Sequence, residues 1–240
     1  FFNATGGIGA DSLSYFGIAS DLPTLKTNLF PLGFPLMLKF FHWIFQDYFW
    51  AGKMLNISMV IVILVFSYFK KFYFRETVLL FAGKTLFYVL NLVISEGPFI
   101  FLLYFLIYLF HERFQEKINP RKFIFIAALL LVLLITFRYS GIYIYLGVAI
   151  FFLMMILKNK ENPLRKDLFL TLLFSGIGIG CYLGFNSYIY RSFAGENFRG
   201  APAHYYAVYI LRDLLGFSNV IDPFIGIKPS SNSVLSISFQ

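Results

Sequence analysis

The chain has 240 residues, of which 59% are hydrophobic, 21% are aromatic and only 13% are charged. Soluble domains carry about 25% charged residues, so this composition excludes an ordinary soluble protein and indicates a membrane protein. The net charge of +8 does not indicate nucleic-acid binding, because the basic residues gather in short loops between apolar stretches, where membrane orientation and anionic headgroups account for them.

The first 50 residues are predicted to form an outer loop along the membrane surface. A short helix is expected over 11–19, opened by Asp11 or Ser12. Residues 31–35 predict a rigid turn, because two prolines fix φ on either side of a glycine. Residues 36–50 are predicted to form an aromatic amphipathic helix, which lies in the membrane interface rather than across it.

Six membrane spans are predicted after this loop. A helix needs about 20 residues to cross roughly 30 Å of hydrocarbon. The apolar block 123–157 would be about 52 Å long as one helix, so Arg138 and Gly141 are expected to divide it into two spans. In chain order, the expected spans are residues 51–69, 77–95, 98–110, 123–137, 142–157 and 168–188.

Three short basic loops predict the orientation of these spans. The loops hold 11 of the 20 Lys and Arg residues. They occupy residues 70–75, 113–122 and 158–166. Such loops stay in the cytoplasm, which places the turns at 95–98 and 138–141 on the outer side of the membrane. The composition rich in Phe, Ile, Lys and Asn favours an AT-rich bacterial genome, and we therefore expect an inner-membrane protein whose site faces the periplasm or exterior.

The expected fold class is therefore all-α, a polytopic transmembrane helical bundle with interfacial amphipathic helices in the first outer loop. The bundle covers 51–188, between the outer loop 1–50 and an outer segment 189–240, in which 204–217 is expected to form another interfacial helix. The chain begins without Met and ends in polar Ser- and Ile-rich sequence. We expect it to be a fragment that lacks a first span and further spans after its last residue.

Three unusual polar residues lie in the outer segments, which suits an enzyme at the outer membrane interface. They are Asp11 in the outer loop, Glu96 at the 95–98 turn and Arg138 between two short spans. Each has a structural alternative. Asp11 could cap a helix, Glu96 could be a solvated acid at a helix start, and Arg138 could extend to the lipid headgroups, as could Lys53.

These residues and their order resemble one family of membrane enzymes. The run from Gly9 to Ala19, followed by the 31–35 turn, resembles the first outer loop of polyprenyl-phosphate-sugar-dependent glycosyltransferases. These belong to the GT-C class, in the branch of protein O-mannosyltransferases and lipid A aminoarabinose transferases. Three further matches complete the resemblance: Lys53 to Asn56, Ser95-Glu96, and the 137–141 break, which is similar to the family's T-R-x-x-G.

The resemblance implies a glycosyltransferase whose donor is a sugar joined to a polyprenyl phosphate. Asp11 would act as the general base on the acceptor hydroxyl. Arg138 and Lys53 would bind the donor phosphate, and Glu96 would bind the sugar or a metal, or orient Arg138. No cofactor is certain, and a divalent metal is left open. The partners would be the lipid-linked donor, membrane lipids and a glycan, lipid or protein acceptor.

Two other classes stay open beside this one. A polysaccharide polymerase or ligase would carry its catalytic residues in large later outer loops, for which 189–240 is the place available. A lipid or solute transporter would use charged residues such as Lys84 and Arg138 along a pathway, and it predicts paired broken helices.

Overall fold

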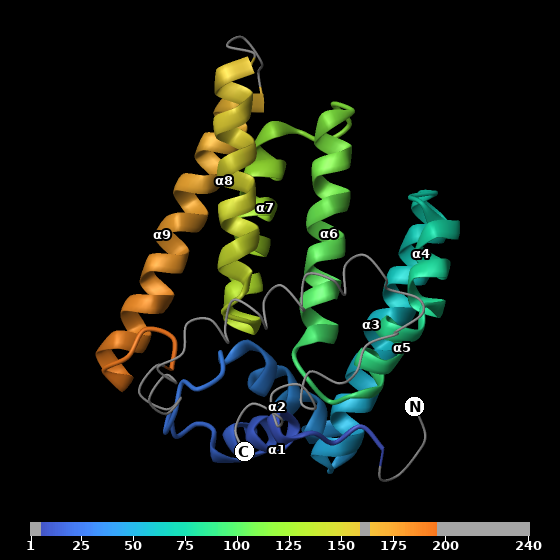
Figure 1. Cartoon of the computed structure of the whole chain (residues 1–240), viewed down its shortest axis with the longest axis vertical. Coiled ribbons are helices and arrows are strands. Elements are labelled where there is room, and N and C mark those ends of the chain that lie inside the picture. The colour runs from blue at the N-terminus through green and yellow to red at the C-terminus, as the bar shows by residue number, and fades with distance from the viewer. Residues whose placement is uncertain (1–5, 159–163, 196–240) are drawn as a thin grey trace, which may run out of the picture.

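A computed structural model describes residues 6–158 and 164–195, and in these ranges the chain forms helices and turns without a strand. Two short helices, α1 (Ala10–Asp21) and α2 (Gly33–Phe45), lie across one end of an upright bundle (Figure 1). We call this end, at the bottom of Figure 1, the site end. The opposite end carries the turns after α3 (Tyr48–Lys70) and α6 (Glu96–Phe114), and we call it the basic end.

Within the described residues, four helices are long and apolar enough to cross a membrane. They are α3, α6, α7 (Pro120–Phe137) and α9 (Leu164–Tyr190). A fifth apolar helix, α8 (Gly141–Lys158), is slightly shorter. The predicted all-α bundle is confirmed, with the architecture of a helical membrane protein.

The predicted division of the block 123–157 is also observed. The helix α7 ends at Phe137, Arg138 is extended with φ of −155° and ψ of 126°, and α8 starts at Gly141. The two helices therefore form two separate passes joined by a tight turn at the site end (Figure 1).

The predicted span 77–95 differs from the structure. It consists of two short helices, α4 (Phe74–Ala82) and α5 (Lys84–Asn91), of nine and eight residues. Gly83 separates them with φ of −62° and ψ of 131°, which is extended rather than helical backbone. A glycine at this point weakens the helix by about 1 kcal/mol relative to alanine, so the break falls there. The returning pass is consequently discontinuous.

The helices of the first outer loop begin and end at other residues than expected. The N-cap of α1 is Gly9, and the Ser12 hydroxyl accepts a hydrogen bond of 3.0 Å from the Gly9 N–H. The helix is therefore not opened by Asp11 or Ser12. The predicted helix 36–50 ends early, because Gln46 adopts a left-handed φ of 58°.

The last residues of that predicted helix belong to α3 instead. The Asp47 carboxylate accepts a 3.0 Å hydrogen bond from the Trp50 N–H and so caps the start of α3 at Tyr48. Side-chain caps of this kind satisfy a backbone N–H that has no partner inside the helix. The left-handed backbone at Gln46 and the side-chain cap at Asp47, rather than the apolar pattern, mark where α2 ends and α3 starts.

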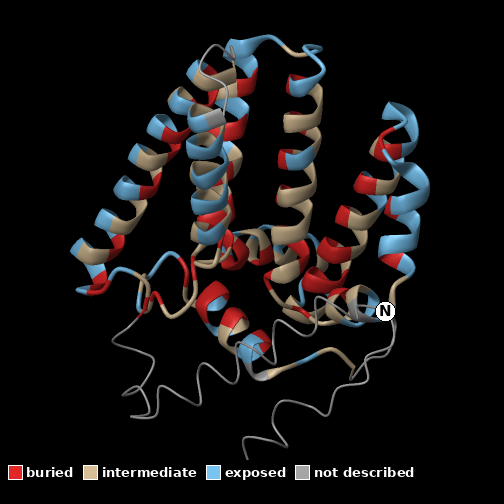
Figure 2. Cartoon of the chain, turned by 45° about the horizontal axis from the view of Figure 1, so that its top comes forward, coloured by how far each residue is buried: buried red, intermediate tan, exposed pale blue. Residues whose placement is uncertain are grey.

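The helix α7 lies at the centre of the core and packs against α2, α6, α8 and α9. Its side chains at Phe123, Leu131 and Leu134 have no exposed surface. Figure 2 shows the complementary pattern, with exposed faces on the outward sides of α4, α8 and α9. Those faces carry large apolar side chains, including Leu157 at 83% exposure, as expected for surfaces that contact lipid.

The outer segment is described only to residue 195. The predicted interfacial helix at 204–217 lies outside the described residues.

Candidate functional site

An ion pair joins the two turns that the sequence places at the site end. Glu96 is the first residue of α6, and its Oε1 pairs with Nη1 of Arg138, the residue directly after α7. Both side chains are about one-third exposed, at 31% and 39%. The Arg138 Nε also donates a 3.1 Å hydrogen bond to the Ser140 hydroxyl. Glu96 thus pairs with Arg138, and its expected role in binding sugar or metal stays a prediction.

A buried tyrosine connects this pair to the first outer loop. The Tyr15 hydroxyl on α1 donates a 2.8 Å hydrogen bond to the Ser95 hydroxyl, the residue directly before Glu96. The Tyr15 ring is 3% exposed and packs edge-to-face on Phe34 of α2, with ring centroids 4.7 Å apart. The hydrogen bond and the ring contacts hold α1 and α2 against the start of α6.

The charges around Tyr15 show which candidate residues the fold brings together. Burial raises the pKa of the Tyr15 phenol to about 12. The hydrogen bond to Ser95 lowers this pKa, the Glu96 carboxylate raises it, the Arg138 guanidinium lowers it and the Asp11 carboxylate raises it. Asp11, Glu96 and Arg138 therefore all act on one phenol, although they belong to three separate parts of the sequence.

Asp11 occupies the first turn of α1, one turn before Tyr15, and is exposed. Because Gly9 is the N-cap, the capping alternative does not apply to Asp11. A carboxylate in the first turn is still stabilised by the helix dipole, so this location is compatible with both a structural and a chemical role. Its exposure leaves it accessible to an incoming hydroxyl group.

Lys53, a predicted ligand of the donor phosphate, is bonded to Asn91 through its side chain. Its side chain is fully buried in α3, and its Nζ donates hydrogen bonds to the Asn91 backbone carbonyl and to Asn91 Oδ1, the latter at 2.8 Å. The ammonium also lies 5.2 Å from the centroid of the Phe49 ring. These contacts tie α3 to the end of α5, and donor-phosphate binding by Lys53 stays a prediction.

Asn56 entered the resemblance only as the end of a motif, with no role predicted for it, but it holds the turn before Glu96. Its Nδ2 donates two hydrogen bonds of 2.9 Å, to the carbonyls of Leu90 and Leu92, and the side chain is fully buried. A Cβ on Gly97 would lie 2.4 Å from Asn56 Oδ1, so this close approach requires glycine. A polar residue one turn after Lys53 on an otherwise apolar helix is the signal that marks Asn56 in the sequence.

A second hydrogen-bond network is centred on Tyr139, the residue after Arg138. The Tyr139 hydroxyl donates to the Asn28 carbonyl at 2.9 Å and accepts from Asn186 Nδ2 at 3.2 Å. Asn28 Nδ2 in turn donates to the Ser192 carbonyl at 2.9 Å. The turn that carries Arg138 is therefore fixed to the first outer loop and to the end of α9.

No group of three or more His, Cys, Asp or Glu with metal-binding geometry occurs among residues 6–158 and 164–195. The candidate ligand Glu96 is paired with Arg138 through Oε1, so a cation bound there would compete with the guanidinium for the carboxylate. Metal binding at Glu96 stays a prediction.

Comparisons with known proteins add no family assignment. No protein-family model matches the sequence, and searches of curated proteins and of solved structures gave no significant match.

Proposed function

We propose that this protein is a membrane glycosyltransferase that moves a sugar from a polyprenyl-phosphate-linked donor to an acceptor hydroxyl. One observation carries the proposal. The ion pair of Glu96 with Arg138 lies next to the hydrogen bond between Tyr15 and Ser95 at one end of an apolar bundle, and the exposed carboxylate of Asp11 lies one helical turn before Tyr15. This set combines a base with a phosphate-binding cation where a lipid-linked substrate would meet water.

Arg138 is the residue proposed to hold the donor phosphate. A guanidinium has five N–H donors in a planar fork, and the contacts to Glu96 and Ser140 use Nη1 and Nε. When the sugar leaves, the polyprenyl phosphate gains negative charge, and a preoriented cation stabilises that charge most in the transition state. Glu96 is a positioning residue, because it acts by orienting the Arg138 side chain.

Asp11 is proposed as the general base. A hydroxyl is a weak nucleophile, so the carboxylate takes its proton as the oxygen attacks the anomeric carbon of the sugar. The bond between that carbon and the phosphate oxygen breaks, and the phosphate leaves with its electron pair. General-base assistance of this kind contributes about 10²–10⁴-fold to the rate.

The proposed location follows from charge. The loops at the basic end are rich in Lys and Arg, which favours a cytoplasmic position and puts the site end on the outer side of the membrane. For a bacterial protein this is the inner membrane, with the site facing the periplasm or exterior. The partners would be the lipid-linked donor, surrounding lipids and an acceptor glycan, lipid or protein.

The test is transfer of radiolabelled sugar from polyprenyl-phosphate-sugar donors by membranes that contain the full-length chain. We expect Asp11→Asn to reduce transfer about 100-fold or more, as loss of a general base does. Arg138→Ala should cost about 10²–10³-fold, as loss of a transition-state donor does. Asp21→Asn is the matched control, because Asp21 ends the same helix and pairs with Lys26 at the surface.

The outcomes test the catalytic role of Asp11 and the enzyme class separately, provided that all variants are present in equal amounts. Unchanged transfer by Asp11→Asn would show that Asp11 is not the base and would make Glu96 the next candidate. Absence of transfer by the wild type with every donor tried would contradict the enzyme class.

One observation favours a transporter as the second candidate. The α4–α5 pass is interrupted at Gly83, with Lys84 directly after the break. Discontinuous helices with a charged residue at the break are a feature of transporters. Uptake of solute or lipid that depends on Lys84, in a protein without transferase activity, would support this alternative.

A further inference from the structure

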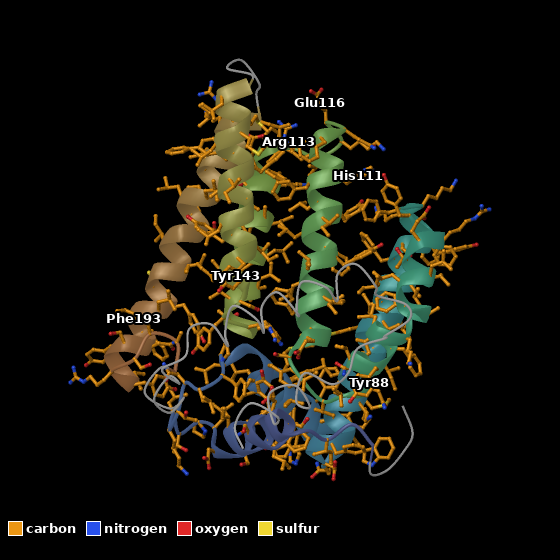
Figure 3. The ribbon with its side chains drawn as sticks, in the orientation of Figure 1. Tyr88, His111, Arg113, Glu116, Tyr143 and Phe193 are labelled. Atoms are coloured by element: carbon orange, nitrogen blue, oxygen red, sulfur yellow. The ribbon has the colours of Figure 1, made fainter. Side chains whose placement is uncertain are left out.

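A large apolar groove runs along the bundle from the basic end towards the start of α8. It has a volume of about 740 Å³, within the range of about 300–1,000 Å³ that is usual for small-molecule sites. The floor is one face of α6, and the walls are α8 and the turn between α3 and α4. Figure 3 shows its two limits, Tyr143 near the start of α8 and His111 near the end of α6.

The groove is a space that protein atoms of the described residues do not fill. A Cβ added to Gly147, on the α8 wall, would meet no heavy atom within 4 Å. Lining side chains such as Ile107 and Tyr143 are 54% and 71% exposed. Because α6 is long and apolar enough to cross a membrane, this surface lies at membrane depth, where the available occupant is hydrocarbon.

The basic end of the groove contains a threonine and a histidine. Thr77 and His111 lie there, and the His111 ring contacts Phe72 and Tyr73 with centroid distances of 5.0 and 5.7 Å. Exposed Lys70 and Lys71 directly precede Phe72. A hydrocarbon chain in the groove would thus have its polar headgroup beside cations at the basic end.

The excess positive charge at the basic end favours an anionic lipid headgroup. Residues 70–76 and 111–122 hold seven Lys or Arg and three Glu. One of the seven, Arg113, is paired with Asp167, which leaves six cations against three carboxylates. Basic clusters beside membrane helices attract anionic lipid headgroups, by about 1 kcal/mol per cation.

We propose that the groove binds an anionic phospholipid, with an acyl chain between α6 and α8 and its phosphate against Lys70 and Lys71. A donor's isoprenoid chain would enter from the other end, because its phosphate would lie with Arg138 and not with Lys70 and Lys71, and the experiment distinguishes the two occupants. The inference does not rest on the proposed transferase activity.

The experiment measures lipid retention by the purified full chain with native mass spectrometry. The protein is titrated with phosphatidylglycerol or with phosphatidylcholine of the same acyl chains, and separately with undecaprenyl phosphate. We expect phosphatidylglycerol to be retained about tenfold better than phosphatidylcholine. The double variant Lys70→Gln with Lys71→Gln should remove this preference, because it removes the two positive charges proposed to contact the lipid headgroup.

The groove itself is tested by filling it. Gly147→Phe should reduce phosphatidylglycerol retention to the level of phosphatidylcholine, whereas Gly180→Phe should not, because Gly180 also faces open space but lies on α9, outside the groove. Ile107→Trp fills the groove from α6, and Ile177→Trp is its control on α9 with a similar exposure of 57%.

Three results would overturn the proposal: equal retention of the two phospholipids, no difference between the groove variants and their controls, or preferential binding of undecaprenyl phosphate that the groove variants abolish. If Gly147→Phe fails to fold, as judged by its elution and thermal unfolding, the Ile107→Trp pair decides the question.

Discussion

At the scale of single residues, Tyr15 links the parts of the candidate site. Its hydroxyl bonds to Ser95, 80 residues away, and its ring packs in the first outer loop. The raised pKa extends the pH range in which the phenol stays protonated and can donate this hydrogen bond, from about pH 10 to about pH 12. Any loosening of this contact would separate Asp11 on α1 from Glu96 on α6.

This contact predicts a pH dependence of stability. The Tyr15 pKa of about 12 lies above the ordinary value of 10.0. Above pH 10 the unfolded phenol loses its proton while the folded one keeps it, so the folded state binds more protons and stability falls with rising pH. The contribution is fully present below pH 10 and is lost as the pH rises through 12, with a size of about 3 kcal/mol.

Thermal unfolding in detergent between pH 8 and 12 measures this effect. We expect Tyr15→Phe to lose about 1 kcal/mol at pH 8 with the hydrogen bond, and then to decline less than the wild type towards pH 12. Tyr188→Phe, at a side chain 83% exposed, should follow the wild-type curve. Parallel curves for Tyr15→Phe and the wild type would contradict the assignment.

At the scale of secondary-structure elements, α9 contains four glycines that the sequence alone does not distinguish. A Cβ on Gly178 would lie 2.7 Å from Cγ2 of Val132 on α7, and one on Gly176 would lie 2.9 Å from the Tyr145 hydroxyl on α8. Gly180 and Gly184 face open space. Gly176 and Gly178 therefore permit close packing against neighbouring helices, whereas Gly180 and Gly184 make no such contact.

This difference predicts opposite effects of the same substitution. Gly178→Ala should destabilise the protein by about 1–3 kcal/mol, because the added methyl group overlaps the stiff Val132 side chain. Gly180→Ala should stabilise it by about 0.5–1 kcal/mol through the higher helix propensity of alanine. Thermal unfolding of the two purified variants tests this, and effects of the same sign would argue against the α7–α9 contact.

At the scale of the whole molecule, a buried ion pair closes the bundle at the basic end. Arg113 on α6 and Asp167 on α9 lie 2.7 Å apart between Nε and Oδ2, with 9% and 7% of the side chains exposed. The pair joins helices that are distant in sequence, so it holds the far end of the bundle as the Glu96–Arg138 pair holds the site end.

Removing one partner of this ion pair should cost more stability than replacing both partners with apolar residues. Asp167→Asn leaves Arg113 buried without its counter-charge and should cost about 3–5 kcal/mol, whereas the double variant Arg113→Met with Asp167→Leu should cost much less. A double-mutant cycle on thermal stability measures the coupling.

The surface pair of Lys26 and Asp21 provides the control. Its side chains are 65% and 41% exposed, so Asp21→Asn should change stability by about 0–1 kcal/mol. Equal losses at the buried and the exposed pair would show that burial does not set the energy of the Arg113–Asp167 contact.

The sequence by itself determined the fold class, most of the spans and the end of the bundle at which the candidate residues gather. Long apolar stretches are local features, and they form helices that are long and apolar enough to cross a membrane. The division at Arg138 and Gly141 followed from the same length argument, because 35 apolar residues exceed one crossing.

Only the tertiary structure decided which partners these residues have. The pairing of Glu96 with Arg138, the hydrogen bond of Tyr15 to Ser95 and the engagement of Lys53 by Asn91 each join separate helices. The groove across α6 arises in the same way, from how neighbouring helices diverge. The hydrophobic pattern predicts which segments of the chain can form membrane-spanning helices. The contacts between those helices depend on side-chain packing in three dimensions, which no local pattern encodes.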